Sequence, residues 1–183
     1  EWNQACRSVR NAGLGFRQTA PHSHGAYLAS VCKTRDLARA LDNDYVLNLD
    51  DSSTHVGEAL QELNSLLPDG KQYTTTLAAD TSQKLFSLLL DKTGHEKRFA
   101  EADLVDRATL LSETEAGARA FWQVLPSQAL QLSVKKEAFL VEVRSRLCMK
   151  EGESDRWCPL CDQVYDTRGL HAKMCAAGGD RTL

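Results

Sequence analysis

The stretch Trp157–Cys175 reads WCPLCDQVYDTRGLHAKMC, and it decides how the C-terminal part of this chain folds. Two residues separate Cys158 from Cys161, nine more lead to His171, and three more lead to Cys175. A Cys-x-x-Cys turn aims two sulfurs at one point, and residues four apart share one face of a helical turn. Zinc binds in a tetrahedron of such thiolate and imidazole ligands. The spacing therefore predicts a zinc site made of Cys158, Cys161, His171 and Cys175.

The predicted metal site is closed. Four protein ligands leave no open coordination position, so we expect a structural metal rather than a catalytic one. A segment this short cannot bury enough apolar surface to fold alone, and metal binding would supply most of its folding energy. We expect Trp157, Tyr165 and Leu170 to form a small core, although a base-stacking role stays open for one of them. A redox pair is disfavoured because no βαβ pattern surrounds the cysteines. Reduced cysteines beside an unrelated surface histidine are the remaining alternative.

Upstream of this segment the chain has the pattern of a helical protein. Of its 183 residues 42% are hydrophobic and 26% are charged, the balance of a folding chain rather than a disordered one. Apolar residues recur at helical spacing, with turn residues between the periodic stretches. The sequence predicts a mainly α fold, an irregular helical bundle over 1–149 followed by a small zinc-knuckle-like module over 150–183. The expected helices cover residues 2–11, 21–32, 36–41, 56–67, 82–94, 96–111, 116–125 and 133–147, with Phe139, Leu140, Val143 and Leu147 on one face of the last.

The formal net charge of −3 hides three blocks of different sign. Residues 1–35 carry five bases and one acid, residues 36–115 carry 7 bases and 16 acids, and residues 116–183 carry 10 bases and 8 acids. Two basic ends therefore flank an acidic middle, an arrangement that can separate a polyanion-facing surface from a solvated one. Ordinary solvated helix faces explain the same counts, so both interpretations stay open.

Sequence signatures of catalysis are weak in this chain. Asp50 and Asp51 follow an apolar stretch, as the metal-binding carboxylates of polymerases do, but that site needs a third carboxylate on a neighbouring strand. No strand-rich stretch precedes the pair, which favours a helix-capping acidic loop. The sequence contains no phosphate loop, nucleophile elbow or His-Glu-x-x-His helix. We therefore expect no enzyme, and no membrane partner, since no apolar run reaches about 18 residues.

Short strings spread over the whole chain share a pattern with a known family. They are Gly13–Arg17, Ala26–Ser30, Asp106–Ser112, Gly117–Trp122, Leu125–Ser127, Phe139–Leu147, and Cys158, Cys161, His171 and Cys175 with Asp166, Gly169 and Gly178–Asp180. Together they resemble the post-polymerase region of non-LTR retrotransposon reverse transcriptases. That region has a glycine-rich turn, an alanine-rich helix, further helices and a Cys-Cys-His-Cys knuckle. Asn11-Ala12 and Phe121-Trp122 depart from the residues more typical of the family.

The resemblance implies a role rather than a reaction. It implies a helical thumb or linker beside a flanking polymerase domain, with a knuckle that clamps RNA or DNA. It also implies that the catalytic parts of the parent polyprotein lie outside these 183 residues. Such a clamp needs cations that meet phosphates, with an aromatic side chain to stack a base. The expected nucleic-acid contacts surround the zinc ligands and are Arg156, Arg168, Lys173 and Arg181.

Two further expectations complete this interpretation. Acidic residues are interleaved with those cations, so we expect binding by the module alone to be modest and salt-sensitive. Reduced thiol ligands fit a nuclear or cytoplasmic protein. The alternative function is a structural or protein-interaction helical domain whose C-terminus is stapled by zinc.

Overall fold

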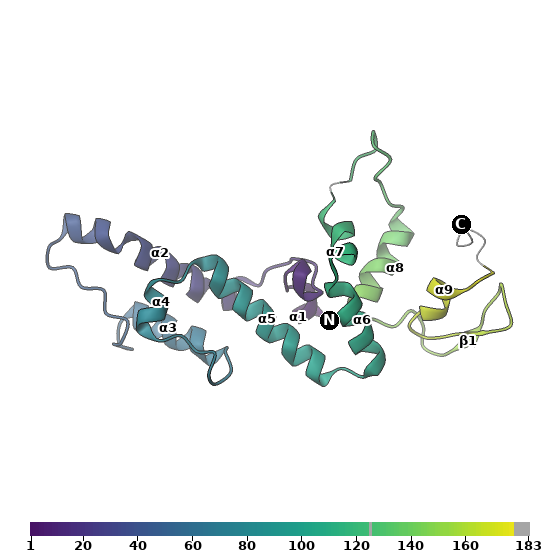
Figure 1. Ribbon diagram of the computed structural model, residues 1–183, viewed down its shortest axis with the longest axis horizontal. Coiled ribbons are helices and arrows are strands. Elements are labelled where there is room, and N and C mark those ends of the chain that lie inside the picture. Colours follow the sequence, from purple (N-terminus) through teal and green to yellow (C-terminus); the bar gives the residue numbers. More distant parts are fainter. Residues whose placement is uncertain (125, 178–183) are drawn as a thin grey trace.

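The computed structural model describes residues 1–124 and 126–177, and within them the chain is mainly helical, as the sequence predicts. In chain order the elements are α1 (Trp2–Ala5), the 3-10 helix η1 (Val9–Asn11), α2 (Thr19–Leu41), α3 (His55–Ser65), α4 (Thr75–Ala79), α5 (Gln83–Glu101), α6 (Leu104–Thr114), α7 (Ala116–Gln123), α8 (Lys136–Arg146), β1 (Arg156–Trp157), β2 (Val164–Tyr165) and α9 (Leu170–Met174). Figure 1 shows α2, α3 and α4 at one end of the molecule and β1 and α9 at the other. None of the described helices has the length and apolar character that a membrane span requires.

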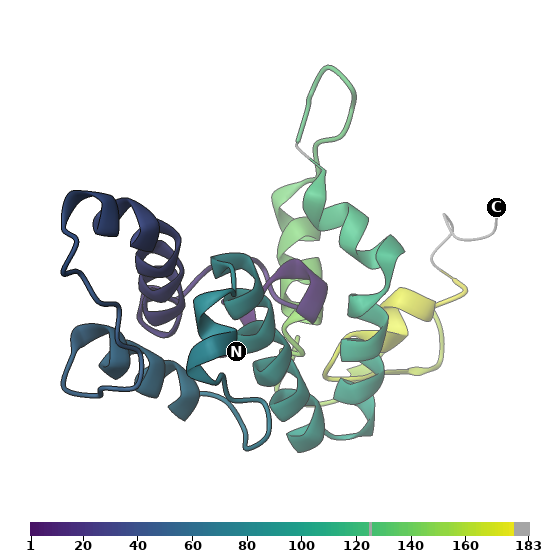
Figure 2. The same cartoon turned by 60° about the vertical axis from the view of Figure 1, so that its left-hand side comes forward.

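The main core lies between α2 and the helices that pack against it. Helix α2 contacts α3, α4 and α5, and Leu28 of α2, Leu63 of α3 and Phe86 of α5 are almost completely buried. Tyr73 adds an edge-on contact to Phe86, with ring centroids 4.7 Å apart. Gly25 allows the close approach of α2 and α5, because a Cβ there would lie 2.8 Å from Phe86 Cβ. Figure 2 shows α5 between this end of the molecule and the helices α6 to α8.

Two helix ends predicted from the sequence are wrong. The expected helices 21–32 and 36–41 form one continuous helix of 23 residues, α2, with Asp36 exposed inside it rather than at an N-cap. Helix α5 continues past Gly94 to Glu101. Gly94 makes room for a contact instead of ending the helix, because a Cβ there would lie 3.1 Å from Arg7 Nε. At Gly94 this tertiary contact outweighs a local preference for a helix end. The turns of α2 after Asp36 are mostly exposed, and α2 continues there because residues 33–41 contain no glycine or proline.

The predicted first helix, 2–11, is interrupted as well. Helix α1 ends at Ala5, η1 follows as a separate turn, and the chain then reverses at Gly13. A Cβ on Gly13 would lie 2.1 Å from the carbonyl oxygen of Arg7, so this close backbone approach requires glycine. The reversal is closed by Leu14 N, which donates to Ala5 O at 3.0 Å.

The acidic pair Asp50-Asp51 lies in an exposed turn that precedes α3. The Asp51 carboxylate accepts from Ser53 Oγ at 2.6 Å and from Ser53 N at 2.9 Å, and these hydrogen bonds lower the pKa of Asp51. The side-chain cap of α3 is Thr54, whose Oγ1 accepts from Gly57 N at 3.1 Å, one residue beyond the predicted 51–53. Asp51 therefore shapes the turn, and Thr54 caps the helix.

Arg146 of α8 is a completely buried cation that joins four parts of the chain. Its Nε donates to Gly13 O at 2.9 Å and its Nη2 donates to Val9 O at 2.6 Å. Its Nη1 pairs with the Glu113 carboxylate of α6, and its guanidinium lies 5.1 Å from the ring centroid of Trp122 in α7. Burial lowers the pKa of Arg146 and Glu113 opposes that shift, so the guanidinium stays charged.

The predicted apolar face of the last helix is only partly buried. Leu147 is buried, whereas Phe139 is 45% exposed and Leu140 is 42% exposed. The helix turns Arg146 inward because the carbonyl groups of the N-terminal reversal need donors that apolar side chains cannot supply.

Replacing Arg146 with methionine should lower the free energy of unfolding by about 3–5 kcal/mol, the usual cost of breaking a buried ion pair from one side. Glu113 and the two carbonyl groups would lose their partner. Denaturant unfolding of the full chain measures this loss. Lys136→Met is the matched control, since Lys136 is exposed on the same helix and makes no ion pair within the described residues. Equal stability of the two variants would contradict the role of Arg146.

Candidate metal centre

The C-terminal module is a two-stranded hairpin followed by one helical turn. Strands β1 and β2 pair antiparallel, with Arg156 opposite Tyr165 and Trp157 opposite Val164. The turn that follows β1 carries Cys158 and Cys161, α9 carries His171, and Cys175 follows directly as the C-cap residue of α9. This is the arrangement that the nine-residue spacer predicts.

The four predicted ligands come together in the structure. The ligand atoms of Cys158, Cys161, His171 and Cys175 all lie within 4.8 Å of one another. Cys175 Sγ lies 3.9 Å from Cys158 Sγ and 3.7 Å from Cys161 Sγ, and Cys161 Sγ lies 3.3 Å from His171 Nε2. A zinc tetrahedron with bonds of about 2.3 Å to sulfur has sulfur–sulfur edges of about 3.8 Å. The cluster therefore has the spacing of a metal site, and its cysteines are free thiols rather than disulfides.

Backbone hydrogen bonds and burial set the protonation of the thiols. Leu160 N donates to Cys158 Sγ at 3.4 Å, and this bond is the main reason that the pKa of Cys158 falls to about 6. Burial raises the pKa of Cys161, and the nearby sulfurs of Cys175 and Cys158 add to the rise. Cys158 is thus a thiolate at neutral pH, and a bound cation would favour the thiolate of Cys161 as well.

Asp166 orders the helical turn that carries His171. Its carboxylate accepts from the backbone N–H groups of Arg168 at 2.9 Å, Leu170 at 3.1 Å and His171 at 2.6 Å. Burial favours a higher pKa for Asp166, but the three hydrogen bonds outweigh it and the pKa is lowered. The ionised carboxylate therefore satisfies free N–H groups at the start of α9 and fixes the backbone that carries His171.

The small core predicted under the knuckle is wrong in one residue. Trp157 is 74% exposed, whereas Tyr165 and Leu170 are partly buried. The Tyr165 ring lies between two contacts, with the Arg156 guanidinium 4.7 Å from its centroid and the His171 ring 6.3 Å away. Trp157 lies in a two-residue strand, and too little chain surrounds it to bury its ring. A base-stacking role for Trp157 stays a prediction.

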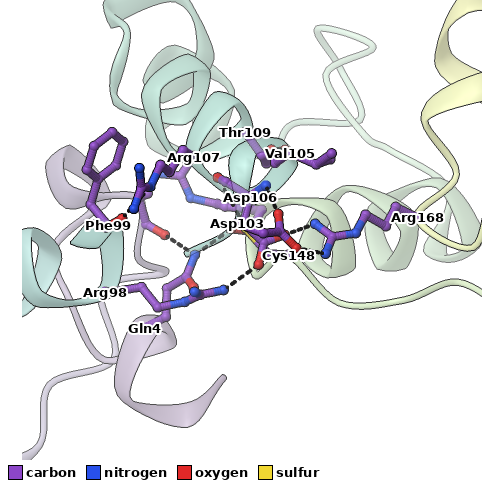
Figure 3. Close-up of polar contacts among 12 residues, drawn as sticks. Gln4, Arg98, Phe99, Asp103, Val105, Asp106, Arg107, Thr109, Cys148 and Arg168 are labelled. Carbon is purple, nitrogen blue, oxygen red and sulfur yellow. Dashed lines mark hydrogen bonds and ion pairs between the residues drawn. The ribbon is translucent and has the colours of Figure 1, made fainter. Parts of the chain in front are cut away.

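Two of the cations predicted to contact nucleic acid join the module to the helical body. Arg168 Nη2 lies 2.6 Å from Asp103 Oδ2, and Arg168 Nη1 pairs with Asp106, which also accepts from Arg98 (Figure 3). Lys173 Nζ donates to Ser145 Oγ of α8 at 2.5 Å. The charge of Arg168 is thus compensated inside the molecule.

Within the described residues, the three predicted cations make contacts on different elements. Arg156 lies over Tyr165 on the hairpin, Arg168 faces α6, and Lys173 faces α8. Arg181 lies outside the described residues. Nucleic-acid contact by any of the four stays a prediction.

The sequence interpretation missed the acidic partners on α6. Asp103 is the N-cap of α6 and accepts from Asp106 N at 2.8 Å. This cap is visible in the sequence as two aspartates three residues apart before an apolar run, but the expected helix 96–111 ran straight through it. Asp103 therefore marks the start of α6 in the sequence, and with it the break between α5 and α6.

Asp166→Ala should weaken Zn²⁺ binding by about 10- to 100-fold, the usual effect of losing a group that orients a ligand. Three backbone N–H groups would lose their acceptor, and the turn that holds His171 would loosen. Competition with a chromophoric chelator measures the affinity. Asp162→Ala is the control, because Asp162 is exposed in the same module and its carboxylate accepts no hydrogen bond within the described residues. Unchanged affinity in Asp166→Ala would show that Asp166 does not support the site.

Comparison with protein-family models, with curated proteins and with solved structures finds no match for this chain. The resemblance to the retrotransposon family therefore stays a prediction. What the structure itself supports is a mainly helical chain whose C-terminal cysteines and histidine could hold a metal ion.

Proposed function

We propose that this chain binds zinc at its C-terminal module and uses that module to bind nucleic acid, without catalysing a reaction. The observation that carries the proposal is the Cys158, Cys161, His171 and Cys175 cluster, whose sulfur spacing matches the edges of a zinc tetrahedron. Three thiolates and an imidazole are soft ligands that favour zinc over calcium or magnesium. Zinc would act structurally here, holding the hairpin and α9 together.

Exposed groups beside the metal ligands support nucleic acid as the partner. Trp157 is 74% exposed and Leu160 is 62% exposed, although the hydrophobic effect favours covering both. Zinc knuckles recognise single-stranded stretches by stacking unpaired bases on aromatic side chains. The exposed Trp157 ring offers such a platform.

The proposal also covers the larger protein to which this segment would belong. The resemblance to the post-polymerase region of non-LTR reverse transcriptases supports RNA or target DNA as the ligand, clamped beside a flanking polymerase domain. The helical body would then act as a thumb or linker that positions the knuckle. Single-stranded RNA and DNA of the same sequence are the two ligands to compare.

Trp157→Ala should weaken binding of a short single-stranded oligonucleotide by about 5- to 150-fold, the loss expected for one stacked base. Fluorescence anisotropy with labelled RNA and DNA at two salt concentrations, on protein that holds one zinc per chain by elemental analysis, measures the effect. Trp2→Ala is the control, since Trp2 is 64% exposed but lies on α1. The proposal fails if the zinc-loaded wild type binds neither oligonucleotide at low salt.

A second candidate function is structural, and one observation favours it. Arg168 and Lys173 use their charges to join the module to α6 and α8 rather than presenting them to solvent. The module would then staple the C-terminal end of the chain to the helical body or dock another protein. The structural function needs Arg168 to dock the module on α6, whereas nucleic-acid binding would need Arg168 to contact a phosphate.

Arg168→Ala should undock the module without changing nucleic-acid affinity. The loss of charged hydrogen bonds costs about 1.5–3 kcal/mol each, so amide hydrogen exchange in residues 150–177 should accelerate by about tenfold or more. Arg156→Ala is the control for the hydrogen-exchange measurement alone, because Arg156 makes no ion pair within the described residues. If Arg168 contacts a phosphate instead, the slope of log affinity against log salt would change by about 0.7.

A further inference from the structure

A basic pocket opens on the helical body, away from the metal ligands. It has a volume of about 620 Å³ and lies where η1, the first turns of α2 and α5, and the end of α7 meet. Three cations line it, Arg10, Arg17 and Lys84, together with His22 and Ser87. None of the described residues that line it is an aspartate or a glutamate. A concave surface lined by one sign of charge attracts ligands of the opposite sign.

The cations of this basic pocket are largely uncompensated. Arg10 and Lys84 are exposed and make no ion pair in residues 1–124 or 126–177. Arg17 Nη2 lies 3.8 Å from Asp91 Oδ2, and Asp91 is buried behind the pocket, where it accepts from Ser8 N at 3.2 Å. The pocket therefore keeps a net positive charge after Asp91 is counted.

Two helix N-termini add to the positive potential. Helix α5 has 19 residues and begins at this pocket with Gln83 and Lys84, and the 23-residue helix α2 contributes His22 of its first turn. Neither has an acidic residue in its first turn, and neither N-cap side chain accepts a hydrogen bond from the helix. The free N–H groups and the positive end of the helix dipole favour anions at such a position.

The polar floor of the pocket supplies hydrogen bonds rather than a nucleophile. His22 Nδ1 lies 3.2 Å from Ser87 Oγ and 3.4 Å from Arg17 Nη1. His22 Nε2 lies 3.8 Å from Asp91 Oδ1, which is too long for the hydrogen bond that would orient a catalytic base. The Ser87, His22 and Asp91 series therefore lacks the geometry of a hydrolytic triad.

We propose that the basic pocket binds phosphate groups and that the backbone of a nucleic-acid strand supplies them. The choice of nucleic acid rests on the function proposed above. Arg168 and Lys173 of the C-terminal module already bind α6 and α8, which leaves Arg156 as the described cation next to Trp157 without an ion pair. A strand stacked on Trp157 therefore needs further phosphate contacts from elsewhere on the chain. Arg10 and Lys84 are free to supply them, and two separated contacts on one strand strengthen binding through effective concentration.

The test removes two charges from the pocket of the full, zinc-loaded chain. The variant is Arg10→Gln with Lys84→Gln, both exposed side chains whose replacement leaves the core intact. The control is Lys33→Gln with Arg39→Gln, which removes the same charge from exposed positions in the C-terminal half of α2. Each protein is titrated with a labelled single-stranded oligonucleotide at several salt concentrations.

The pocket variant should bind the oligonucleotide several-fold more weakly than the control at low salt. Its slope of log affinity against log salt should be smaller by about 1.4, the change expected when two phosphate contacts to a single strand are lost. A pocket variant that matches the control in affinity and slope overturns the nucleic-acid part of the proposal.

Titration with inorganic phosphate tests whether the pocket binds phosphate at all, separately from whether a nucleic acid supplies that phosphate. At matched ionic strength, phosphate should raise the melting temperature of the wild type and of the control but not of the pocket variant. If phosphate behaves in this way while no protein binds the oligonucleotide, the phosphate site stands, its source is a free phosphate compound, and the function proposed above fails. If phosphate stabilises all three proteins equally or none of them, the phosphate site is overturned.

Discussion

The buried guanidinium of Arg146 is the contact on which the arrangement of the second half of the molecule depends. It is the one side chain in the described structure that reaches the N-terminal reversal, α6 and α7 from α8. A buried charge costs several kcal/mol unless every donor is used, so this arrangement persists only while all three partners are in place. The N-terminal segment therefore cannot move independently of the helices that precede the metal centre.

The position of the metal centre follows from the same helices. Glu113, which neutralises Arg146, lies on α6. The acids that bind Arg168 stand at the other end of α6, so one helix connects the buried cation to the C-terminal module. The metal would hold the module together internally, and the ion pairs decide where the module sits. Trp157 is 74% exposed and takes no part in the ion pairs that dock Arg168 on α6, so the two proposed roles use different side chains.

Prediction from the sequence succeeded where the deciding contacts are short-range. The four ligands could be named because a four-residue turn and one turn of helix supply them in pairs, and the short spacer joins the two pairs. Helix formation was predictable from apolar spacing, but the helix ends expected at Asp36 and Gly94 were wrong. At Gly94 a contact with Arg7 accompanies the continuation of α5, whereas α2 continues past Asp36 through turns that are mostly exposed. Trp157 was misplaced because exposure depends on neighbours that the spacing does not specify.

The sequence by itself determined a mainly helical chain and a Cys-Cys-His-Cys cluster, because both follow from periodicity and spacing over a few residues. Only the tertiary structure decided what the cations do. Arg168 meets a carboxylate 62 residues away in the chain, and Arg146 meets a carbonyl 133 residues away. Arg10 and Lys84 share a pocket only because η1 packs beside α5. Charges look alike in a sequence, and their partners become visible only when distant segments are folded together.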